Sequence, residues 1–437
     1  MESVKASDEI KNYISQAVIR ASQWTLPNGS THENSDSIEV QRVGVIGGGT
    51  MGRGIALALV LAGYEAIIVE HTYEAVQACQ KEVALTIKRE VSLKRFKEKD
   101  VHRLKSNALM YTTDLNLLKD CQLIIEAIFE NMNMKIELFQ KLDKILPENA
   151  IFGTNTSSLN IDEMAKAIAN PSRVVGIHFF NPPHVIKVVE IVFGSYTSGT
   201  AVATAFEVCQ RMRKLAVLVG NCPSFVFNRL LAVYINQSMK LMYEYGLLPK
   251  DIDNIITSRG FLMGPITVVD MNGLDVAEKV KTEHNVPLNK LEIELLKQKR
   301  YGRKTGKGFY KYDEITKKKE SDLEVEFLIQ SVASSASPNI SLYCDSDVYE
   351  FIIFPLINEG YLCLEEGMIE EEQLIDILFI LGFGWPVNTG GPMHWAKEIG
   401  VKKIAEKLAL WNNLNPTARE YKLSKTLRKN ASMVCKL

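Results

Sequence analysis

The sequence lacks an excess of charge of either sign, and it lacks any long apolar run. Its 437 residues carry 51 Lys and Arg against 52 Asp and Glu, which leaves a formal net charge of -1. A balanced total provides no general electrostatic attraction to nucleic acid or to an acidic membrane surface. The apolar stretches are too short, or too interrupted by charge, to span a bilayer. We therefore expect neither nucleic acid nor a membrane among the partners.

Paired metal-binding or disulfide motifs are missing as well. The seven cysteines include no CxxC pair and are odd in number, which favours a reducing compartment over a disulfide framework. The seven histidines show no paired spacing with cysteine, so we expect no metal. The first residues, Met1 to Lys5, contain no apolar segment typical of a secretory signal.

What the sequence does contain, from about residue 40 to residue 220, is an alternation of strand and helix. A helix rich in small side chains is predicted over 50–62, and a long charged helix is predicted over 73–98. Strands separated by helices predict an α/β fold with a mostly parallel sheet covered on both faces. The apolar runs predicted as strands are 42–47, 65–70, 123–127, 151–154, 174–178, 185–192 and 215–219.

The two flanks of this region read differently. Residues 8–23 have helical spacing of apolar side chains, and the polar stretch 27–37 reads as a linker. After Asn221 helical patterns dominate, and 313–338 reads as a connector with partial helix. The predicted helices are 224–245, 249–258, 274–284, 347–366, 370–381 and 392–412.

The helical half contains a weak internal repeat, for which duplication is favoured over chance similarity. The first copy has Tyr243-Glu244-Tyr245-Gly246, Asp253, Gly260-Phe261 and Gly264-Pro265. The second copy has, in the same order, Leu364-Glu365-Glu366-Gly367, Asp376, Gly382-Phe383 and Gly391-Pro392.

A glycine-rich turn follows the first predicted strand: Gly47-Gly48-Gly49-Thr50-Met51-Gly52. Gly47 permits a tight turn, Gly49 lets the backbone approach a pyrophosphate, and Gly52 allows close packing of helix on strand. The helix that follows favours the phosphate charge at its N-terminus. Glu70, at the end of the next strand, can accept from both ribose hydroxyls and would repel a 2′-phosphate. No Arg follows Glu70, so the pattern favours NAD over NADP.

A histidine and a carboxylate stand at the ends of two later apolar runs. His178 opens the segment His178-Phe179-Phe180-Asn181-Pro182, and Glu190 lies twelve residues beyond it. Neighbouring strands can bring the two within hydrogen-bonding reach, where a carboxylate fixes the tautomer of the imidazole and stabilises its protonated form. On spacing alone, a structural histidine is the more common alternative.

Two further features have weaker signals. Asn228 lies in the first helix after the sheet and could hold a substrate oxygen, although a structural amide fits equally well. The region 81–105 carries nine Lys and Arg against four acids, which is usually a solvated helix face. It has no interleaved aromatics, so a small molecule rich in phosphate is a better partner for it than nucleic acid.

Together these motifs resemble the L-3-hydroxyacyl-CoA dehydrogenase family, over about 400 residues from near Trp24 to near Trp411. The resemblance covers the glycine turn, the HFFNP segment with Glu190, and Asn228-Arg229. It also covers Glu126-Ala127-Ile128-Phe129-Glu130-Asn131, Asn155-Thr156-Ser157-Ser158-Leu159, Lys304-Thr305-Gly306-Lys307-Gly308-Phe309-Tyr310 and Gly390-Gly391-Pro392-Met393. The second helical copy and Glu70, where single-module relatives have Asp, resemble the dehydrogenase half of peroxisomal bifunctional enzymes.

The resemblance implies a role for each matching residue. It implies that His178 is the general base, with Glu190 as its carboxylate partner, and that Ser157 and Asn228 contact the substrate oxygen. Cofactor-side positions are implied for Gly47, Gly49, Thr50, Met51, Gly52, Glu70, Glu130, Lys135 and Asn181. The basic helix after Glu70 matches the region that faces the CoA nucleotide, where Lys94 is the candidate.

It also implies a domain organisation with a Rossmann-type sheet followed by two tandem helical C-terminal domains of this family. The expected boundaries are 1–40 for the helix and linker, 41–220 for the NAD-binding domain, 221–315 for the first helical domain, 316–344 for a connector and 345–437 for the second helical domain with the tail. The hydratase half that precedes this module in bifunctional enzymes is missing, so we expect no hydratase activity. We expect a monomer, because the second helical copy could cover the surface that single-module relatives use to pair.

The function expected from these observations is NAD-dependent oxidation of (3S)-3-hydroxyacyl-CoA to 3-ketoacyl-CoA in fatty-acid β-oxidation. A non-catalytic dinucleotide-binding protein and a 2-hydroxyacid or sugar-acid dehydrogenase on a similar fold are the alternatives. The presence of both His178 and Glu190 argues against the first, and the HFFNP segment argues against the second. The C-terminal Cys435-Lys436-Leu437 is one residue away from the Ser-Lys-Leu address, so we expect a peroxisomal import receptor as a partner.

Overall fold

The computed structural model describes residues 6–283, 286–314, 316 and 318–432. The chain divides into two compact units. The sheet unit comprises residues 11–227 and 367–383, and the helical unit comprises residues 6–10, 228–366 and 384–432. The sheet unit therefore includes a short segment, 367–383, from the region after residue 345 that the sequence predicts as a second helical domain.

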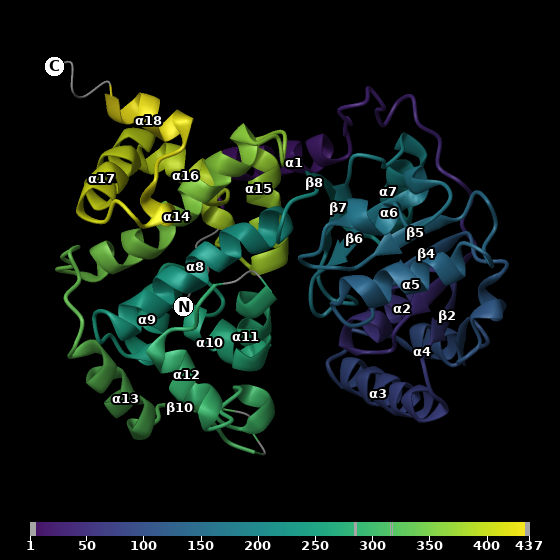
Figure 1. The fold of residues 1–437 in the computed structure, drawn as a ribbon, viewed down its shortest axis with the longest axis horizontal. Coiled ribbons are helices and arrows are strands. Elements are labelled where there is room, and N and C mark those ends of the chain that lie inside the picture. The colour runs from purple at the N-terminus through teal and green to yellow at the C-terminus, as the bar shows by residue number, and fades with distance from the viewer. Residues whose placement is uncertain (1–5, 284–285, 315, 317, 433–437) are drawn as a thin grey trace. The chain divides into compact units, whose positions relative to one another are not determined.

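An eight-stranded sheet with the order β3-β2-β1-β4-β5-β6-β7-β8 forms the centre of the sheet unit (Figure 1). All neighbouring strands pair in parallel except β6 and β7, which are antiparallel. The sheet is thus mostly parallel, as the sequence predicts. The strands are β1 Arg42–Ile46, β2 Glu65–Val69, β3 Leu109–Thr112, β4 Leu123–Glu126, β5 Ile151–Thr154, β6 Val174–Phe179, β7 Val188–Phe193 and β8 Leu215–Gly220.

Apolar side chains of these strands point alternately to the two faces of the sheet, and each face is covered by helices. One core holds Val43 and Val45 of β1, while Ile46 of the same strand belongs to the core on the other face. Helices α2, α3, α4 and α7 contribute to the first core, and α5 and α6 contribute to the second. The helices of this unit are α1 Asp8–Ala21 from residue 11 onward, α2 Thr50–Ala62, α3 Tyr73–Ser92, α4 Glu98–Leu104, α5 Met132–Leu142, α6 Ile161–Ala165, α7 Gly199–Arg211 and α15 Glu372–Leu378.

The segment 367–383 is held in the sheet unit by polar contacts with strand β8 and with helix α1. The Gly220 backbone N–H at the end of β8 donates to the Met368 carbonyl at 2.7 Å. Tyr13 of α1 donates its hydroxyl to Asp376 of α15 at 2.6 Å, and Arg20 of α1 lies 2.6 Å from the Glu371 carboxylate. Helix α1 and this segment therefore support each other on the sheet.

The helical unit packs its helices around buried acidic side chains as well as apolar ones. Asp270 accepts from the backbone N–H groups of Phe309 and Tyr310 at 2.8 and 2.9 Å, and from the Tyr312 hydroxyl at 3.0 Å. A short hairpin, β9 Lys311–Tyr312 with β10 Lys319–Glu320, follows this contact. The helices are α8 Phe225–Tyr243 from residue 228 onward, α9 Pro249–Thr257, α10 Pro265–Asn272, α11 Leu274–Glu283, α12 Lys290–Lys297, α13 Leu323–Ala333, α14 Asp345–Glu365, α16 Pro392–Ile399, α17 Val401–Leu414 and α18 Lys425–Ser432.

Two helices predicted as continuous are interrupted. The helix predicted over 73–98 ends at Ser92, because Lys94 adopts a left-handed conformation (φ 57°) and Arg95 folds back to bond the Glu90 carboxylate at 3.1 Å. The turn allows Phe96 to enter the core. The helix predicted over 392–412 is divided at Gly400, which has a φ of 95°.

The ranges predicted from the sequence leave out β3, the short hairpin of β9 and β10, and the helices α4, α5, α6, α7, α10, α12 and α18. Strand β3 is a four-residue edge strand with only Leu109 buried, which gives a weak apolar pattern. Among the described residues, no helix is long and apolar enough to cross a membrane.

Asp270 gives the fold a testable dependence on pH. Burial raises the pKa of the Asp270 carboxyl from its ordinary value of 3.8 to about 6, although its three donors oppose the shift. The folded protein thus binds this proton more tightly than the unfolded chain does. The stabilisation of the folded state by the protonated Asp270 carboxyl is therefore complete below about pH 4 and is lost as the pH rises through about 6.

We expect the stability difference between the wild type and Asp270→Asn to become smaller from pH 4.5 to pH 7, because the amide does not titrate. The change should be at most about 3 kcal/mol, at ~1.4 kcal/mol for each pKa unit. Urea unfolding at the two pH values measures both differences. Equal differences at the two pH values would contradict the raised pKa.

Candidate active site

Most of the predicted site residues lie at one edge of the sheet. Strands β1, β2, β4, β5 and β6 run parallel, so their carboxyl ends meet at that edge, where ligand sites open in such sheets. The glycine turn follows β1, and His178 is the penultimate residue of β6. The other residues at this edge are Glu70 after β2, Glu130 after β4, Ser157 after β5 and Asn181 after β6.

Two of the glycines are required by the close packing of the turn. Gly47 has a φ of 98°, and a Cβ there would lie 2.6 Å from the Ala127 carbonyl oxygen. A Cβ on Gly52 would lie 1.7 Å from the Gly47 carbonyl oxygen. A side chain at Gly52 would therefore push α2 away from the turn after β1, and one at Gly47 would clash with the backbone that follows β4.

Gly49 differs from them in what surrounds it. Within the described part of the chain, no heavy atom outside Gly49 and its two chain neighbours lies within 4 Å of the position where its Cβ would be. Gly49 also precedes α2, whose first turn includes Thr50 and Met51 and has no side-chain cap at Gly49. Open space beside a helix N-terminus fits the pyrophosphate of a dinucleotide.

Glu70 lies directly beside this turn. Its Oε1 accepts from the Gly48 backbone N–H at 2.6 Å, and its Oε2 lies 3.1 Å from Nδ1 of the exposed His71. The Glu70 side chain retains 15% exposure. A partly exposed carboxylate at the end of β2, next to the glycine turn, fits the ribose hydroxyls of NAD.

The antiparallel pairing of β6 and β7 brings His178 and Glu190 together. The register pairs the two residues directly across the strands, and His178 Nδ1 lies 2.7 Å from Glu190 Oε2. The Phe227 backbone N–H donates to Glu190 Oε1 at 2.8 Å. Glu190 is fully buried, so this carboxylate has a partner on each of its oxygens in place of water.

Aromatic rings surround the imidazole. The ring centres of Phe180 and Phe225 lie 5.0 and 5.6 Å from that of His178, both edge to face. His178 is 5% exposed. In such a weakly polar environment, the interaction between the imidazole and the Glu190 carboxylate is stronger than it would be in water.

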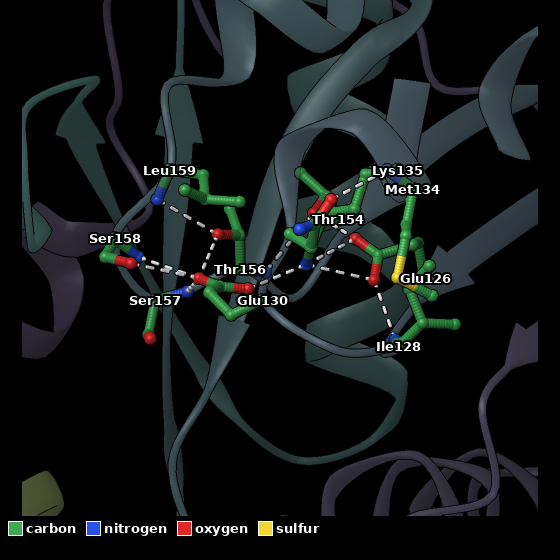
Figure 2. Close-up of polar contacts among 11 residues, drawn as sticks. Glu126, Ile128, Glu130, Met134, Lys135, Thr154, Thr156, Ser157, Ser158 and Leu159 are labelled. Carbon is green, nitrogen blue, oxygen red and sulfur yellow. Dashed lines mark hydrogen bonds and ion pairs between the residues drawn. The ribbon is translucent and has the colours of Figure 1, made fainter. Parts of the chain in front are cut away.

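Glu130 joins two of the other predicted residues. Lys135 of α5 places its Nζ 2.8 Å from Glu130 Oε2, and the Ser157 backbone N–H donates to Glu130 Oε1 at 2.9 Å (Figure 2). Burial alone would raise the pKa of the Glu130 carboxyl, but the Lys135 charge and hydrogen bonds from the 156–157 segment lower it to about 2. Glu130 therefore remains ionised at physiological pH.

Two residues near this edge have contacts to which the sequence analysis assigned no role. Asn155 accepts from the Phe179 backbone N–H at 2.9 Å and so links the loop after β5 to the strand of His178. Glu126, the last residue of β4, is fully buried and contacts Lys135. An acid that ends an otherwise apolar central strand is a signal that could have identified Glu126.

The remaining predicted residues are less closely tied to this edge. Asn181 is exposed and precedes Pro182 in a cis peptide bond. Lys94 is exposed in the turn between α3 and α4. Asn228 is half-buried in α8 and belongs to the helical unit. No group of three or more His, Cys, Asp or Glu within the described residues could hold a metal ion.

The models of two known families match the chain. The model of the family "3-hydroxyacyl-CoA dehydrogenase, NAD binding domain" matches residues 42–222. The model of the family "3-hydroxyacyl-CoA dehydrogenase, C-terminal domain" matches residues 225–312. The first match contains the glycine turn, Glu130, Ser157, His178 and Glu190, and the second contains Asn228.

Individual relatives extend the similarity beyond these matches. The peroxisomal bifunctional enzyme of Danio rerio is 33% identical over 430 residues, covering 94% of this chain and 58% of that protein. The chain thus spans little more than half the length of this curated relative. The human peroxisomal bifunctional enzyme is 31% identical, with coverage of 94% and 59%.

A solved structure covers almost the whole chain. The crystal structure of the dehydrogenase part of multifunctional enzyme 1 from C. elegans is 48% identical, covers 98% of both chains and has a TM-score of 0.74. The 3-hydroxybutyryl-CoA dehydrogenase of Escherichia coli is 25% identical and has a TM-score of 0.75, covering 91% of this chain and 100% of that one. The chain therefore belongs to the 3-hydroxyacyl-CoA dehydrogenase family.

Proposed function

We propose that this protein oxidises (3S)-3-hydroxyacyl-CoA to 3-ketoacyl-CoA with NAD in fatty-acid β-oxidation. The observation that carries the proposal is the buried pair of His178 and Glu190, 2.7 Å apart at the edge of an NAD-binding sheet. An acid–base pair at this place suits removal of a proton from a substrate hydroxyl. A steady-state assay with acetoacetyl-CoA and NADH tests the activity in the reductive direction.

In the oxidative direction, His178 Nε2 takes the proton of the 3-hydroxyl group. Nδ1 is committed to Glu190, which fixes the tautomer that leaves Nε2 as the acceptor. As the imidazole becomes positively charged, the adjacent Glu190 carboxylate stabilises it. NAD supplies the acceptor for the hydride that leaves C3, and the C3 oxygen becomes the carbonyl of the product.

The family resemblance and the geometry support the following roles for the residues that would hold the substrate and the cofactor. Ser157 and Asn228 would donate to the reacting oxygen, and Asn181 would lie near the nicotinamide. The open space at Gly49 and the carboxylate of Glu70 fit the pyrophosphate and the ribose of NAD. Glu130 and Lys135 would act on the cofactor side, and the exposed Lys94 would contact the CoA nucleotide.

We further propose that residues 221–315 and 345–437 are tandem copies of one helical domain, joined by the connector 316–344. Residues 1–40 would then form the leading helix with its linker, and residues 41–220 the NAD-binding domain. Both copies begin with a long helix, α8 or α14, and continue to a short helix with a buried aspartate, Asp253 or Asp376. Each then has a helix that starts with proline after glycine, at Pro265 and Pro392.

Specific recognition of NAD generates the first functional prediction. Glu70→Ala should relax the preference for NADH over NADPH, because it removes the charge that would repel a 2′-phosphate. The ratio of kcat/KM for the two cofactors, measured with acetoacetyl-CoA, gives the preference. If the wild type used NADPH as efficiently as NADH, the role of Glu70 would be refuted.

The acid–base pair generates the second. His178→Ala should lower kcat by ~10²-fold or more, the scale typical of general acid–base catalysis. Glu190→Gln should also lower kcat while leaving NADH binding intact, which fluorescence titration would show. Near-normal turnover of either purified variant would reject the assignment.

The tandem copies generate a prediction of the oligomeric state. We expect a monomer, because the second copy could cover the surface through which single-module relatives pair. Light scattering at micromolar concentration should give a mass close to the 49.1 kDa of one chain. A mass of twice that value would contradict the proposal.

The final proposal of this section is a peroxisomal location with an import receptor as partner. The relatives include enzymes named as peroxisomal and glyoxysomal, and the C-terminal Cys435-Lys436-Leu437, which lies outside the described residues, resembles a receptor-read address. A fluorescent protein fused to the N-terminus should appear in peroxisomes, and deletion of Leu437 should make the signal diffuse. Deletion without any effect would exclude the tripeptide as the address.

A further inference from the structure

Glu126 is bonded on every side within the sheet unit. Its Oε1 accepts from the Ile128 backbone N–H at 2.7 Å and from Lys135 Nζ at 3.0 Å. Its Oε2 accepts from the same Nζ at 2.9 Å and from the Thr154 hydroxyl at 2.6 Å. The side chain is completely buried, so Glu126 has no surface for a ligand.

Lys135 connects Glu126 to Glu130. Its Nζ contacts both oxygens of Glu126 and lies 2.8 Å from Glu130 Oε2, and the side chain is 1% exposed. One ammonium group thus binds two carboxylates, that of Glu126 at the end of β4 and that of Glu130 in the segment just after it. Of the three side chains, only Glu130 retains appreciable exposure, at 17%.

The other oxygen of Glu130 organises the loop after β5. Glu130 Oε1 accepts from the backbone N–H groups of Ser157 at 2.9 Å and Ser158 at 3.2 Å, and from the hydroxyls of Thr156 and Ser158. Figure 2 shows the Ser157 hydroxyl pointing away from this carboxylate. Glu130 therefore fixes the Ser157 backbone and leaves the hydroxyl directed elsewhere.

All five backbone N–H groups of the loop from Asn155 to Leu159 have partners in this arrangement. Asn155 donates to the Glu126 backbone carbonyl at 2.8 Å. Thr156 and Leu159 donate to the threonine hydroxyls of residues 154 and 156, and both of these hydroxyls donate in turn to Glu126 or Glu130. The loop conformation thus depends on the two carboxylates, since an unpaired buried N–H group is costly.

We propose that Glu126 is a positioning residue that sets the orientation of the Ser157 hydroxyl through Lys135 and Glu130. The inference rests on the proposed function, in which Ser157 contacts the reacting oxygen. Glu126 holds the Lys135 ammonium and the Thr154 hydroxyl, the ammonium holds one oxygen of Glu130, and the other oxygen of Glu130 holds the loop. Glu126 itself touches neither substrate nor cofactor.

Amide hydrogen exchange of Ser157 and Ser158 tests the proposal without requiring activity. In Glu126→Gln the neutral amide cannot hold Lys135 by charge, so we expect both N–H groups to exchange ~10-fold faster than in the wild type. The matched control is Asp143→Asn, because Asp143 also forms an ion pair, with Arg173, and lies at the opposite end of α5 from Lys135. The control should leave exchange at Ser157 and Ser158 within about twofold of the wild type.

Unchanged exchange in Glu126→Gln would overturn the proposal. Equal acceleration in the control would overturn it too, because the effect would then reflect general loss of stability. If Glu126→Gln does not fold, Glu126→Asp replaces it, since the shorter side chain keeps the charge but retracts it from Lys135.

Kinetics provide the second measurement, with acetoacetyl-CoA and NADH. Glu126→Gln should lower kcat by ~10-fold and change the KM for NADH by less than about threefold, because the affected group acts on the reacting oxygen. In a Ser157→Ala background, the same substitution should have no further effect beyond about twofold. If Glu126→Gln lowered kcat by the same ~10-fold in the Ser157→Ala background, Glu126 would not act through Ser157, and the proposal would be overturned.

The two proposals fail in different ways. An inactive wild type would reject the proposed function, while hydrogen exchange would still decide whether Glu126 positions the loop. An active wild type with equal activity in Glu126→Gln would reject the positioning role alone.

Discussion

A carboxylate with no access to water must find positive charge or hydrogen-bond donors inside the protein, and two such groups lie in the strands of the central sheet. Glu126 ends β4 and Glu190 lies within β7, and both are fully buried. The groups that bind each carboxylate belong to the candidate site. Glu190 fixes the imidazole of His178, and Glu126 fixes the ammonium that supports the loop of Ser157.

The architecture that brings these groups together was largely accessible from the sequence. Apolar runs predicted seven of the eight strands, and the HFFNP segment with a carboxylate on the following strand predicted the contact between His178 and Glu190. The contact forms because β6 and β7 are antiparallel neighbours, which places these two residues opposite each other. Apolar runs are sufficient to predict these strands because a strand that is covered on both faces of a sheet carries mostly apolar side chains.

Other parts could not be predicted, because they depend on contacts between distant segments. The end of α3 is set by the left-handed conformation of Lys94 and by the bond between Arg95 and Glu90, and neither has a pattern of its own in the sequence. The aspartates at matching positions of the proposed repeat also have different partners. Asp253 accepts from the Tyr310 hydroxyl in the helical unit, whereas Asp376 accepts from Tyr13 of α1 in the sheet unit. A repeat in sequence therefore does not determine which contacts each copy makes.

The two buried carboxylates differ in the chemistry of their partners, and this difference separates their functions. An imidazole exchanges a proton near neutral pH, so a carboxylate beside it can stabilise a charge that appears and disappears during a reaction. An ammonium group held between two carboxylates keeps a constant geometry instead. Glu190 is thus suited to a step in which His178 changes charge, and Glu126 is suited to holding the Ser157 loop still while that step occurs. Under the proposed function, one edge of the sheet would combine the imidazole that accepts the proton with a network that holds the Ser157 loop beside it.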